Sequence, residues 1–265
     1  MAKIERMKSL PFPYGERYVA FIDILGFKEM VVHIGENVEA FQVLSCLPTI
    51  LAQVASENRT MFSDTPDFQC TAFSDSVVIS TDASSISPFV GIYSIVYAVH
   101  ALGKRFLKAG ALVRGGLSKG VLYHKGPILF GLGMVQAYEL ETTIARVPRV
   151  VVSPAVRRVW DEAFAGGHWL AVLKDVIKTD NDGMGYVDLF HFPQGGSIDS
   201  ATLDFIKTAG HILAHLLNKP GLPLAAWTKI VWLANQYNRA DIVRRLRALG
   251  KTLPNIEIPM EPMAS

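Results

Sequence analysis

The sequence contains little cysteine and almost no excess of charge of either sign. Its two cysteines, Cys46 and Cys70, form neither a CxxC pair nor part of a metal-ligand cluster. We interpret both as reduced core residues, which is typical of a cytoplasmic protein. Lys and Arg number 26 and Asp and Glu 24, a net charge of +2. Because a nucleic-acid-binding surface needs a basic excess, we expect no nucleic-acid partner.

The sequence also lacks a segment that would cross a membrane. Residues 83–103 carry no charged side chain, but only residues 89–102 are strongly apolar. That run is shorter than the roughly 20 residues that a membrane-spanning helix needs. The first residues mix charges with prolines, unlike a secretory signal. We therefore expect a cytoplasmic protein without a membrane partner, in which residues 89–102 belong to a buried helix.

Half of the 265 residues are hydrophobic, so the chain can form a sizeable core. Strand patterns occur at residues 17–25, 68–80 (a hairpin), 112–123, 150–153 and 186–192. Helical patterns occur at residues 36–54, 89–109, 135–141, 154–165, 203–217 and 224–249. We expect Pro48 to kink the first of these helices or to begin a second one. This order predicts an α+β fold in which helices cover a mostly antiparallel sheet.

The last third of the chain has helical patterns only. We therefore divide the chain into a mixed domain at residues 1–195 and a C-terminal helical extension at residues 196–265. The tail from residue 252 is rich in proline and methionine, and we expect it to be loose.

Two acidic residues interrupt β-rich runs. Asp23 lies within FIDILGF (residues 21–27), and Asp75 lies between two serines at the tip of the expected hairpin. An unpaired carboxylate in an apolar strand is costly, so it usually has a partner or a metal. Two carboxylates from adjacent strands, near a glycine, suit a two-metal site for phosphoryl transfer. An alternative stays open, in which Asp23 caps a turn with Gly26 and Asp75 is an ordinary turn residue.

The run from Asp23 to Phe27 resembles the first metal motif of class III adenylate and guanylate cyclases. The run FSDS at residues 73–76 is similar to their second metal motif, with Ser74 where the family usually has glycine. RGGLSKG (114–120), GLGMVQAYELE (131–141) and VVVS (150–153) resemble the later motifs of the same family, in the same order.

The resemblance covers about residues 18–192 and implies a cyclase-like fold with two divalent metal ions, Mn²⁺ or Mg²⁺. It implies that Asp23, Asp75 and the backbone carbonyl of Ile24 bind these ions. It further implies a nucleoside triphosphate substrate whose phosphates face the start of the helix at Phe27.

Several positions depart from the cyclases that make cyclic purine nucleotides. Thr71 stands where those enzymes read the base with lysine, and Leu132 stands at their second base-reading position. Val135 and Glu139 replace the asparagine and arginine of the helix that steadies the phosphate. A short threonine and an apolar leucine cannot read the edge of adenine as a Lys–Asp pair does, so we do not expect adenylate cyclase activity.

This combination resembles the bacterial pyrimidine cyclases of Pycsar antiphage systems, as do residues 182–188 and 232–235. The resemblance implies conversion of UTP to 3′,5′-cyclic UMP and pyrophosphate, with Thr71 among the nucleotide-binding residues. Cytidylate cyclase activity, from CTP to cyclic CMP, is the alternative. The resemblance also implies a homodimer with composite sites, whose product signals in antiviral defence to an effector that senses the cyclic nucleotide.

Arg114 is the first candidate to replace the phosphate-binding arginine that is missing at Glu139. We expect it to bind the nucleotide and to stabilise charge that develops on the α-phosphate. Its alternative role is that of a solvated residue at a strand edge. A cyclase-like domain that only binds a nucleotide also remains open, since Val135 and Glu139 favour it.

Overall fold

The computed structural model describes residues 14–35, 38–62, 67–83, 88–165, 173–193 and 197–263. In this part of the chain a sheet of eight strands has the order β2-β3-β1-β4-β6-β8-β7, and β5 pairs with β4 off this path. The strands are β1 (Gly15–Ile24), β2 (Gln69–Phe73), β3 (Ser76–Asp82), β4 (Val113–Lys125), β5 (Ile128–Phe130), β6 (Val150–Val152), β7 (Ile177–Thr179) and β8 (Gly185–Val187). Only the β4–β6 pairing in the described sheet is parallel.

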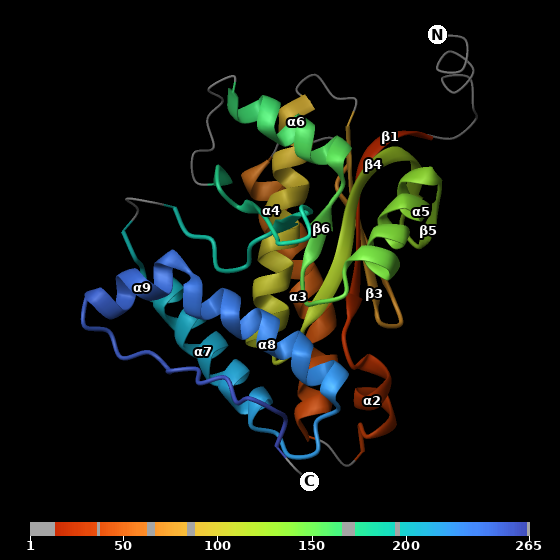
Figure 1. Cartoon of the computed structure of the whole chain (residues 1–265). Coiled ribbons are helices and arrows are strands. Elements are labelled where there is room, and N and C mark those ends of the chain that lie inside the picture. The colour runs from red at the N-terminus through yellow and green to blue at the C-terminus, as the bar shows by residue number, and fades with distance from the viewer. Residues whose placement is uncertain are drawn as a thin grey trace.

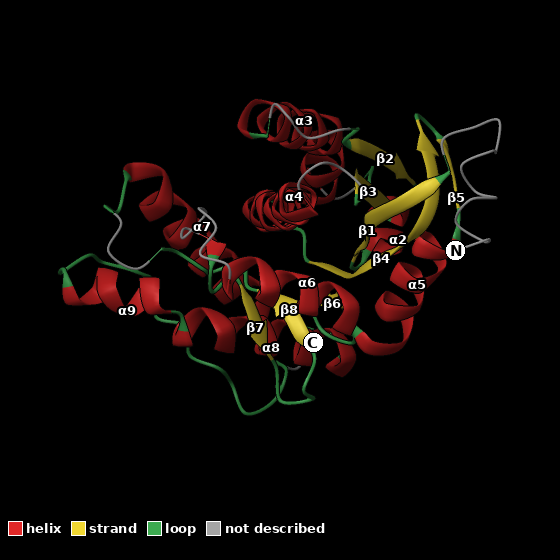
Figure 2. Cartoon of the chain, turned by 90° about the horizontal axis from the view of Figure 1, so that it is seen from above, coloured by secondary structure: helices red, strands yellow, loops and turns green. Residues whose placement is uncertain are grey.

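Helices cover both faces of this sheet, with α3, α4 and α6 on one face and α5 on the other (Figure 2). The helices are α2 (Phe27–Val32), α3 (Val38–Met61), α4 (Pro88–Lys108), α5 (Leu132–Glu139), α6 (Pro154–Ala165), α7 (Ser200–Leu217), α8 (Leu224–Arg239) and α9 (Asp241–Ala248), and a π-helical segment η1 (Leu140–Ile144) continues α5. The predicted α+β fold, a mostly antiparallel sheet covered by helices, is confirmed.

The central strand β1 is apolar along most of its length because both of its faces are buried. Alternate residues of a strand point to opposite faces. Tyr18, Ala20 and Ile22 accordingly enter the core under α3 and α4, whereas Val19 and Phe21 enter the smaller core under α5. Continuous apolar character therefore marks β1 as a central strand rather than an edge strand.

Helices α7, α8 and α9 bury a hydrophobic cluster of their own, beside α4 and away from α5 (Figure 1). Leu107 at the end of α4 and Phe190 belong to the same cluster and join it to the sheet domain. The tail expected to be loose is packed against these helices. Ile256 is buried in the cluster, and its carbonyl oxygen accepts a hydrogen bond of 2.9 Å from Asn238 Nδ2.

Several expected boundaries were wrong. Pro48 lies inside the single helix α3 and does not begin a second helix, and the strand expected at residues 186–192 ends at Val187. The helix expected at residues 224–249 is broken at Ala240, whose backbone is extended at φ −63° and ψ 134°. The domain boundary expected at residue 195 lies outside the described residues.

The cysteine interpretation was wrong in one respect. Both cysteines are free, but Cys46 is exposed on α3 rather than buried, and Cys70 is half-buried. The segment that lacks charged residues forms most of α4, as expected. No helix of the described segments is long and apolar enough to cross a membrane.

Candidate active site

Asp23 lies near the end of β1, between two other strands of the sheet. The antiparallel register places it opposite Ser76 of β3 on one side and Arg114 of β4 on the other. The backbone N–H of Ile24 donates a hydrogen bond of 2.9 Å to the carbonyl oxygen of Asp75. The tip of the β2–β3 hairpin is thereby tied to the end of β1, and Asp23, Asp75 and Arg114 share one end of the sheet.

The hairpin tip adopts a conformation that favours glycine. Ser74 has a φ of 54°, in the left-handed region. A turn of this kind ends β2 directly before Asp75 and allows the chain to reverse into β3. Ser74 therefore adopts the left-handed conformation that would suit the glycine of the resembled motif.

Arg114 lies between two carboxylates. Its Nε donates to Asp23 Oδ2 at 3.2 Å and lies 2.6 Å from Glu141 Oε1. The Arg114 side chain is 27% exposed, that of Asp23 17% and that of Glu141 3%. These contacts exclude the alternative in which Arg114 is a solvated residue at a strand edge. It is instead a partly buried cation that two acids share.

Glu141 was not singled out from the sequence, although it belongs to the segment that resembles a cyclase motif. It lies in η1, which packs directly on β4 because Gly116 has no side chain. A Cβ at Gly116 would collide with the backbone oxygen of Ala137 and with Leu140. Glycine at this position therefore allows the close approach that brings Glu141 to Arg114.

One carboxylate oxygen of Glu141 accepts no hydrogen bond from the described residues. This atom, Oε1, is close to Arg114, but the two are not aligned as a hydrogen bond. Buried carboxylate oxygens are normally satisfied. The signal available in the sequence was an acidic residue at the end of a segment with many apolar residues. The π-helical geometry that turns Glu141 toward Arg114 could not be recognised from the sequence.

The site has more negative than positive charge. Burial raises the pKa of Asp23, and the Arg114 guanidinium opposes this rise. Burial also raises the pKa of Glu141, against the effect of Arg114, and the charges of Asp23 and Asp75 raise it further. The carboxylates of Asp23, Asp75 and Glu141 are thus close enough to interact electrostatically, and Arg114 is the guanidinium beside them. The charge of Lys229 lowers the pKa of Asp23 and Glu141 to a smaller extent.

This charge balance fits a divalent cation. Oxygen atoms of carboxylates and backbone carbonyls are the donors that Mg²⁺ and Mn²⁺ prefer. No group of three His, Cys, Asp or Glu residues in the described segments is spaced to hold a metal by itself. A cation would therefore be bound by Asp23 and Asp75 together with oxygens of a ligand. The side chain of Ile24 is a hydrocarbon, so Ile24 could contribute only through its backbone carbonyl oxygen.

Phe27 begins α2, immediately after the turn at Gly26, which has a φ of 77°. Its side chain is partly buried against the core under α3 and α4. Because the ring is used in packing, any contact between Phe27 and a nucleotide would come from its backbone.

Thr71 lies on β2, at the level of Val78 and therefore further along the sheet than the pair of Asp23 and Ser76. Its hydroxyl donates to the carbonyl oxygen of Gly126 at 2.6 Å, and it lies 2.9 Å from His124 Nε2. Because the hydroxyl proton is used toward Gly126, Nε2 of His124 carries the proton and donates to Thr71. The threonine hydroxyl is therefore held in one orientation.

His124 is held in turn by Ser80, whose Oγ lies 2.8 Å from Nδ1 and accepts a hydrogen bond of 2.9 Å from Arg17 Nε. His124 is 3% exposed. Burial and the nearby Arg17 charge lower its pKa to about 4. The ring is therefore neutral at pH 7, with Nδ1 as an acceptor and Nε2 as a donor.

Three of the four positions that depart from purine cyclases lie on the outer side of α5. Leu132 is 60% exposed and Val135 49% exposed, and Glu139 is also exposed. Gly133 and Ala137 are buried toward the sheet.

No protein-family model matches the sequence, and no curated protein matches it. The fold is similar to solved structures of adenylyl and guanylyl cyclases, the group to which the sequence resemblance points. One is the adenylyl cyclase CyaB from P. aeruginosa, with 18% identity over 68% of this chain and 97% of that chain and a TM-score of 0.44.

A second is the guanylate cyclase domain of RhGC from Catenaria anguillulae in complex with GTP, with 15% identity over 65% of this chain and 94% of that chain and a TM-score of 0.44. A third is a bacterial light-regulated adenylyl cyclase, with 13% identity over 74% of this chain and 98% of that chain and a TM-score of 0.42. Similarity at these identities and TM-scores concerns the fold alone.

Proposed function

We propose that this chain is a nucleotidyl cyclase that converts UTP to 3′,5′-cyclic UMP and pyrophosphate. The observation that carries the proposal is the meeting of Asp23, Asp75 and Arg114 at one end of the sheet, where negative charge exceeds positive charge. Such a site suits a substrate that brings both phosphate oxygens and counterions. The resemblance of the run from Asp23 to Phe27 favours cyclisation over other phosphoryl transfers.

In this reaction the ribose 3′-oxygen forms a bond to the α-phosphorus, and the bond from that phosphorus to the bridging oxygen breaks. Pyrophosphate leaves, and the hydroxyl proton is released. Two divalent cations, Mn²⁺ or Mg²⁺, held by Asp23, Asp75 and the Ile24 carbonyl, would lower the pKa of the 3′-hydroxyl and neutralise phosphate charge. Asp23 and Asp75 supply the negative charge that holds the triphosphate through these ions.

Arg114 supplies the cation that opposes charge developing on the α-phosphate. In the free protein its Nε contacts Asp23. Glu141 contacts the same nitrogen from the other side and is almost fully buried. Glu141 therefore acts as a positioning residue, because it keeps the guanidinium at the site when Asp23 binds a cation.

Thr71 offers the base a hydrogen-bond acceptor, whereas the choice of a pyrimidine rests on the resemblance to Pycsar cyclases. Its hydroxyl donates to the Gly126 carbonyl and accepts from His124, so it can only accept a further hydrogen bond. The N3–H of uracil and the 4-amino group of cytosine are both suitable donors, as are the amino groups of the purines, so this contact does not by itself select the base. UTP is the preferred assignment and CTP the alternative.

A homodimer is part of this proposal. Several large apolar side chains of β5 and α5 are exposed: Ile128, Phe130, Leu132, Val135 and Tyr138. Exposed apolar side chains gathered on one region are typical of an interaction surface. A partner chain there would explain why the outer side of α5 is apolar.

We further propose that residues 1–195 form the catalytic domain and residues 196–265 a helical extension. The separate hydrophobic cluster of α7, α8 and α9 supports this division. The cyclic nucleotide would act as a second messenger in antiviral defence, on an effector that senses it. This last step rests on the resemblance to Pycsar cyclases.

The site assignment is tested by Asp75→Asn, with Asp175→Asn as the matched control, since Asp175 is exposed and remote from the site in sequence. Purified proteins are incubated with UTP or CTP and Mn²⁺, and cyclic nucleotides are quantified by mass spectrometry. We expect Asp75→Asn to lower turnover by at least about 100-fold, because it weakens cation binding, and the control to retain activity. Wild-type turnover in Asp75→Asn would contradict the assignment. A wild-type chain that binds UTP without turnover would support the binding-only alternative.

A further inference from the structure

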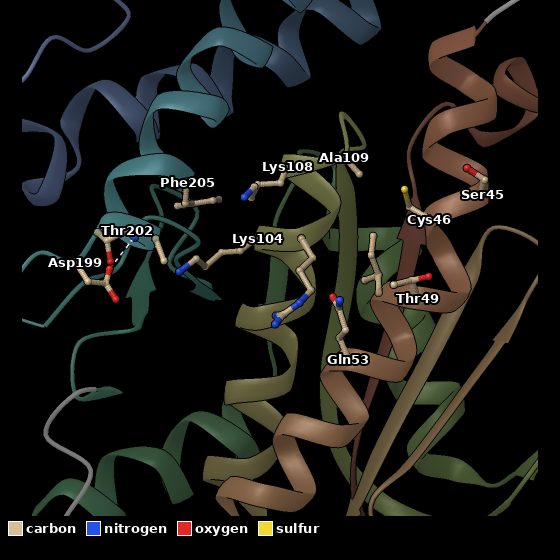
Figure 3. Close-up of a pocket in the computed structure, with 13 residues that line it drawn as sticks. Ser45, Cys46, Thr49, Gln53, Lys104, Lys108, Ala109, Asp199, Thr202 and Phe205 are labelled. Carbon is tan, nitrogen blue, oxygen red and sulfur yellow. Dashed lines mark hydrogen bonds between the residues drawn. The ribbon is translucent and has the colours of Figure 1, made fainter.

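A pocket of about 700 Å³ lies between α3, α4 and the start of α7 (Figure 3). None of the residues that line it belongs to the site at the end of β1. Its volume falls within the range of small-molecule binding sites, which is roughly 300–1,000 Å³. The pocket is therefore separate from the proposed catalytic site and has the size of a ligand-binding site.

One wall of the pocket carries three cations from α4: Lys104, Arg105 and Lys108. Arg105 forms an ion pair with Glu57 of α3. Lys108 Nζ lies 2.6 Å from Asp204 Oδ2 of α7, and both side chains are largely exposed. These two cations are thus already paired.

Lys104 differs from its two neighbours. It forms no ion pair with the described residues, and its Nζ lies 4.5 Å from the ring centroid of Phe192 and 4.7 Å from that of Phe205. Burial and the nearby Arg105 charge together lower the pKa of Lys104 to about 8, although Asp199 opposes this. An ammonium group that is partly desolvated and lacks a carboxylate partner would gain from a bound anion.

The acid in the pocket is already used. Asp199 caps α7, and its side chain accepts a hydrogen bond of 2.7 Å from the backbone N–H of Thr202. Figure 3 shows Lys104 reaching toward Asp199 and Thr202, while Thr49 of α3 borders the pocket from the other side. Hydroxyl donors and an unpaired ammonium therefore line a space that Phe205 borders with an aromatic ring.

We propose that this pocket binds a small organic oxyanion, with its charged group at Lys104 and Thr202 and its apolar or aromatic body against Phe205. The proposal does not depend on the cyclase assignment. A ligand there would touch both α4 and α7 and would join the sheet domain to the C-terminal helices. Binding would therefore raise the melting temperature.

The test uses phenyl phosphate as the probe, with benzyl alcohol as its neutral counterpart, in isothermal titration calorimetry at pH 7. We expect phenyl phosphate to bind the wild-type chain, and benzyl alcohol to bind at least about tenfold more weakly. Lys104→Met should weaken phenyl phosphate binding by a similar factor. Lys207→Met, an exposed lysine on α7 that does not line the pocket, removes the same charge and should leave the affinity unchanged.

The pH dependence gives a second measurement. Phosphate esters of this kind are mostly dianionic above about pH 7. Lys104 lies beside Arg105 and Lys108 on α4 and near Asp199, which stays ionised. Lys104 itself loses its proton in this range, so affinity should fall as pH rises from 7 to 9. Thr49→Trp, which fills the pocket from α3, should abolish binding without removing a charge. The proposal is overturned if phenyl phosphate does not bind the wild-type chain, or if Lys104→Met and Thr49→Trp chains that melt as the wild type does bind it equally well.

Discussion

Replacing Arg114 with methionine removes the cation that Asp23 and Glu141 share and keeps much of the side-chain stem. Removal of one partner from a fully buried ion pair costs about 3–5 kcal/mol. Glu141 is 3% exposed, which favours a cost in this range, but Arg114 is 27% exposed and solvent screens part of the interaction. We therefore expect Arg114→Met to lower the free energy of unfolding by about 2–3 kcal/mol at pH 8.

The loss should depend on pH in a defined direction. Burial already raises the pKa of Asp23 and Glu141, and without Arg114 both pKa values rise further. A carboxyl whose pKa is higher in the folded than in the unfolded chain destabilises the fold as pH rises through that interval. The deficit of Arg114→Met should therefore be large at pH 8 and small at pH 5, where the buried acids can accept protons.

The assay is urea unfolding followed by tryptophan fluorescence at both pH values, with EDTA present to remove metal ions. Glu141→Gln provides the second arm of a double-mutant cycle. In the Glu141→Gln background, Arg114→Met should cost at least about 1 kcal/mol less than in the wild type, because the buried charge is gone. An equal loss in both backgrounds, or an equal loss at pH 5 and pH 8, would refute the reasoning.

Three further predictions concern other parts of the fold. Gly116→Ala should destabilise the chain by at least about 2 kcal/mol in urea unfolding, because its Cβ would meet the backbone of α5, whereas Gly15→Ala, which has open space, should change stability by less than about 1 kcal/mol. His124 has its pKa lowered to about 4, so the fold should lose about 2 kcal/mol between pH 7 and pH 5 as the unfolded chain takes up a proton. His124→Asn should remove this part of the pH slope, and an unchanged slope would contradict the assigned network. Leu213→Ala, at a fully buried position of α7, should cost about 2–5 kcal/mol, and Leu249→Ala, at a position 64% exposed, less than about 0.5 kcal/mol; equal costs would contradict the packing of α7.

The elements that local chemistry determines were predictable from the sequence. The helix at residues 154–165 has the predicted bounds, because Ser153 and Pro154 mark its start. The central strand β1 and the helix α4 were visible as long apolar runs. The α+β arrangement followed from their order along the chain.

Features that depend on packing were not predictable in this way. The break at Ala240 involves neither glycine nor proline, and the strands β5 and β7 are three residues long. Cys46 is exposed on α3 because it borders the pocket between α3, α4 and α7, which local apolar content does not indicate. Such features require knowledge of which faces meet in the folded chain.

The candidate site likewise has residues that could be predicted from the sequence and contacts that could not. Asp23 and Asp75 were found because each interrupts an otherwise apolar or β-rich run. The contact between Arg114 and Asp23 depends on the register of two strands 91 residues apart. Glu141 depends on a π-helical turn above Gly116, which no sequence period reveals. The carboxylates were therefore predictable, whereas the partners that set their charge balance were not.

The central claim is that the carboxylates at the end of β1 serve the cyclisation of a pyrimidine nucleotide. It is tested most directly by incubation of the purified chain with ATP, GTP, CTP and UTP in separate reactions with Mn²⁺, followed by mass spectrometry of the nucleotide products. We predict cyclic UMP and pyrophosphate as the main products, and their loss in Asp23→Ala. Cyclic AMP or cyclic GMP as the main product, or no cyclic product from any of the four nucleotides, would contradict the claim.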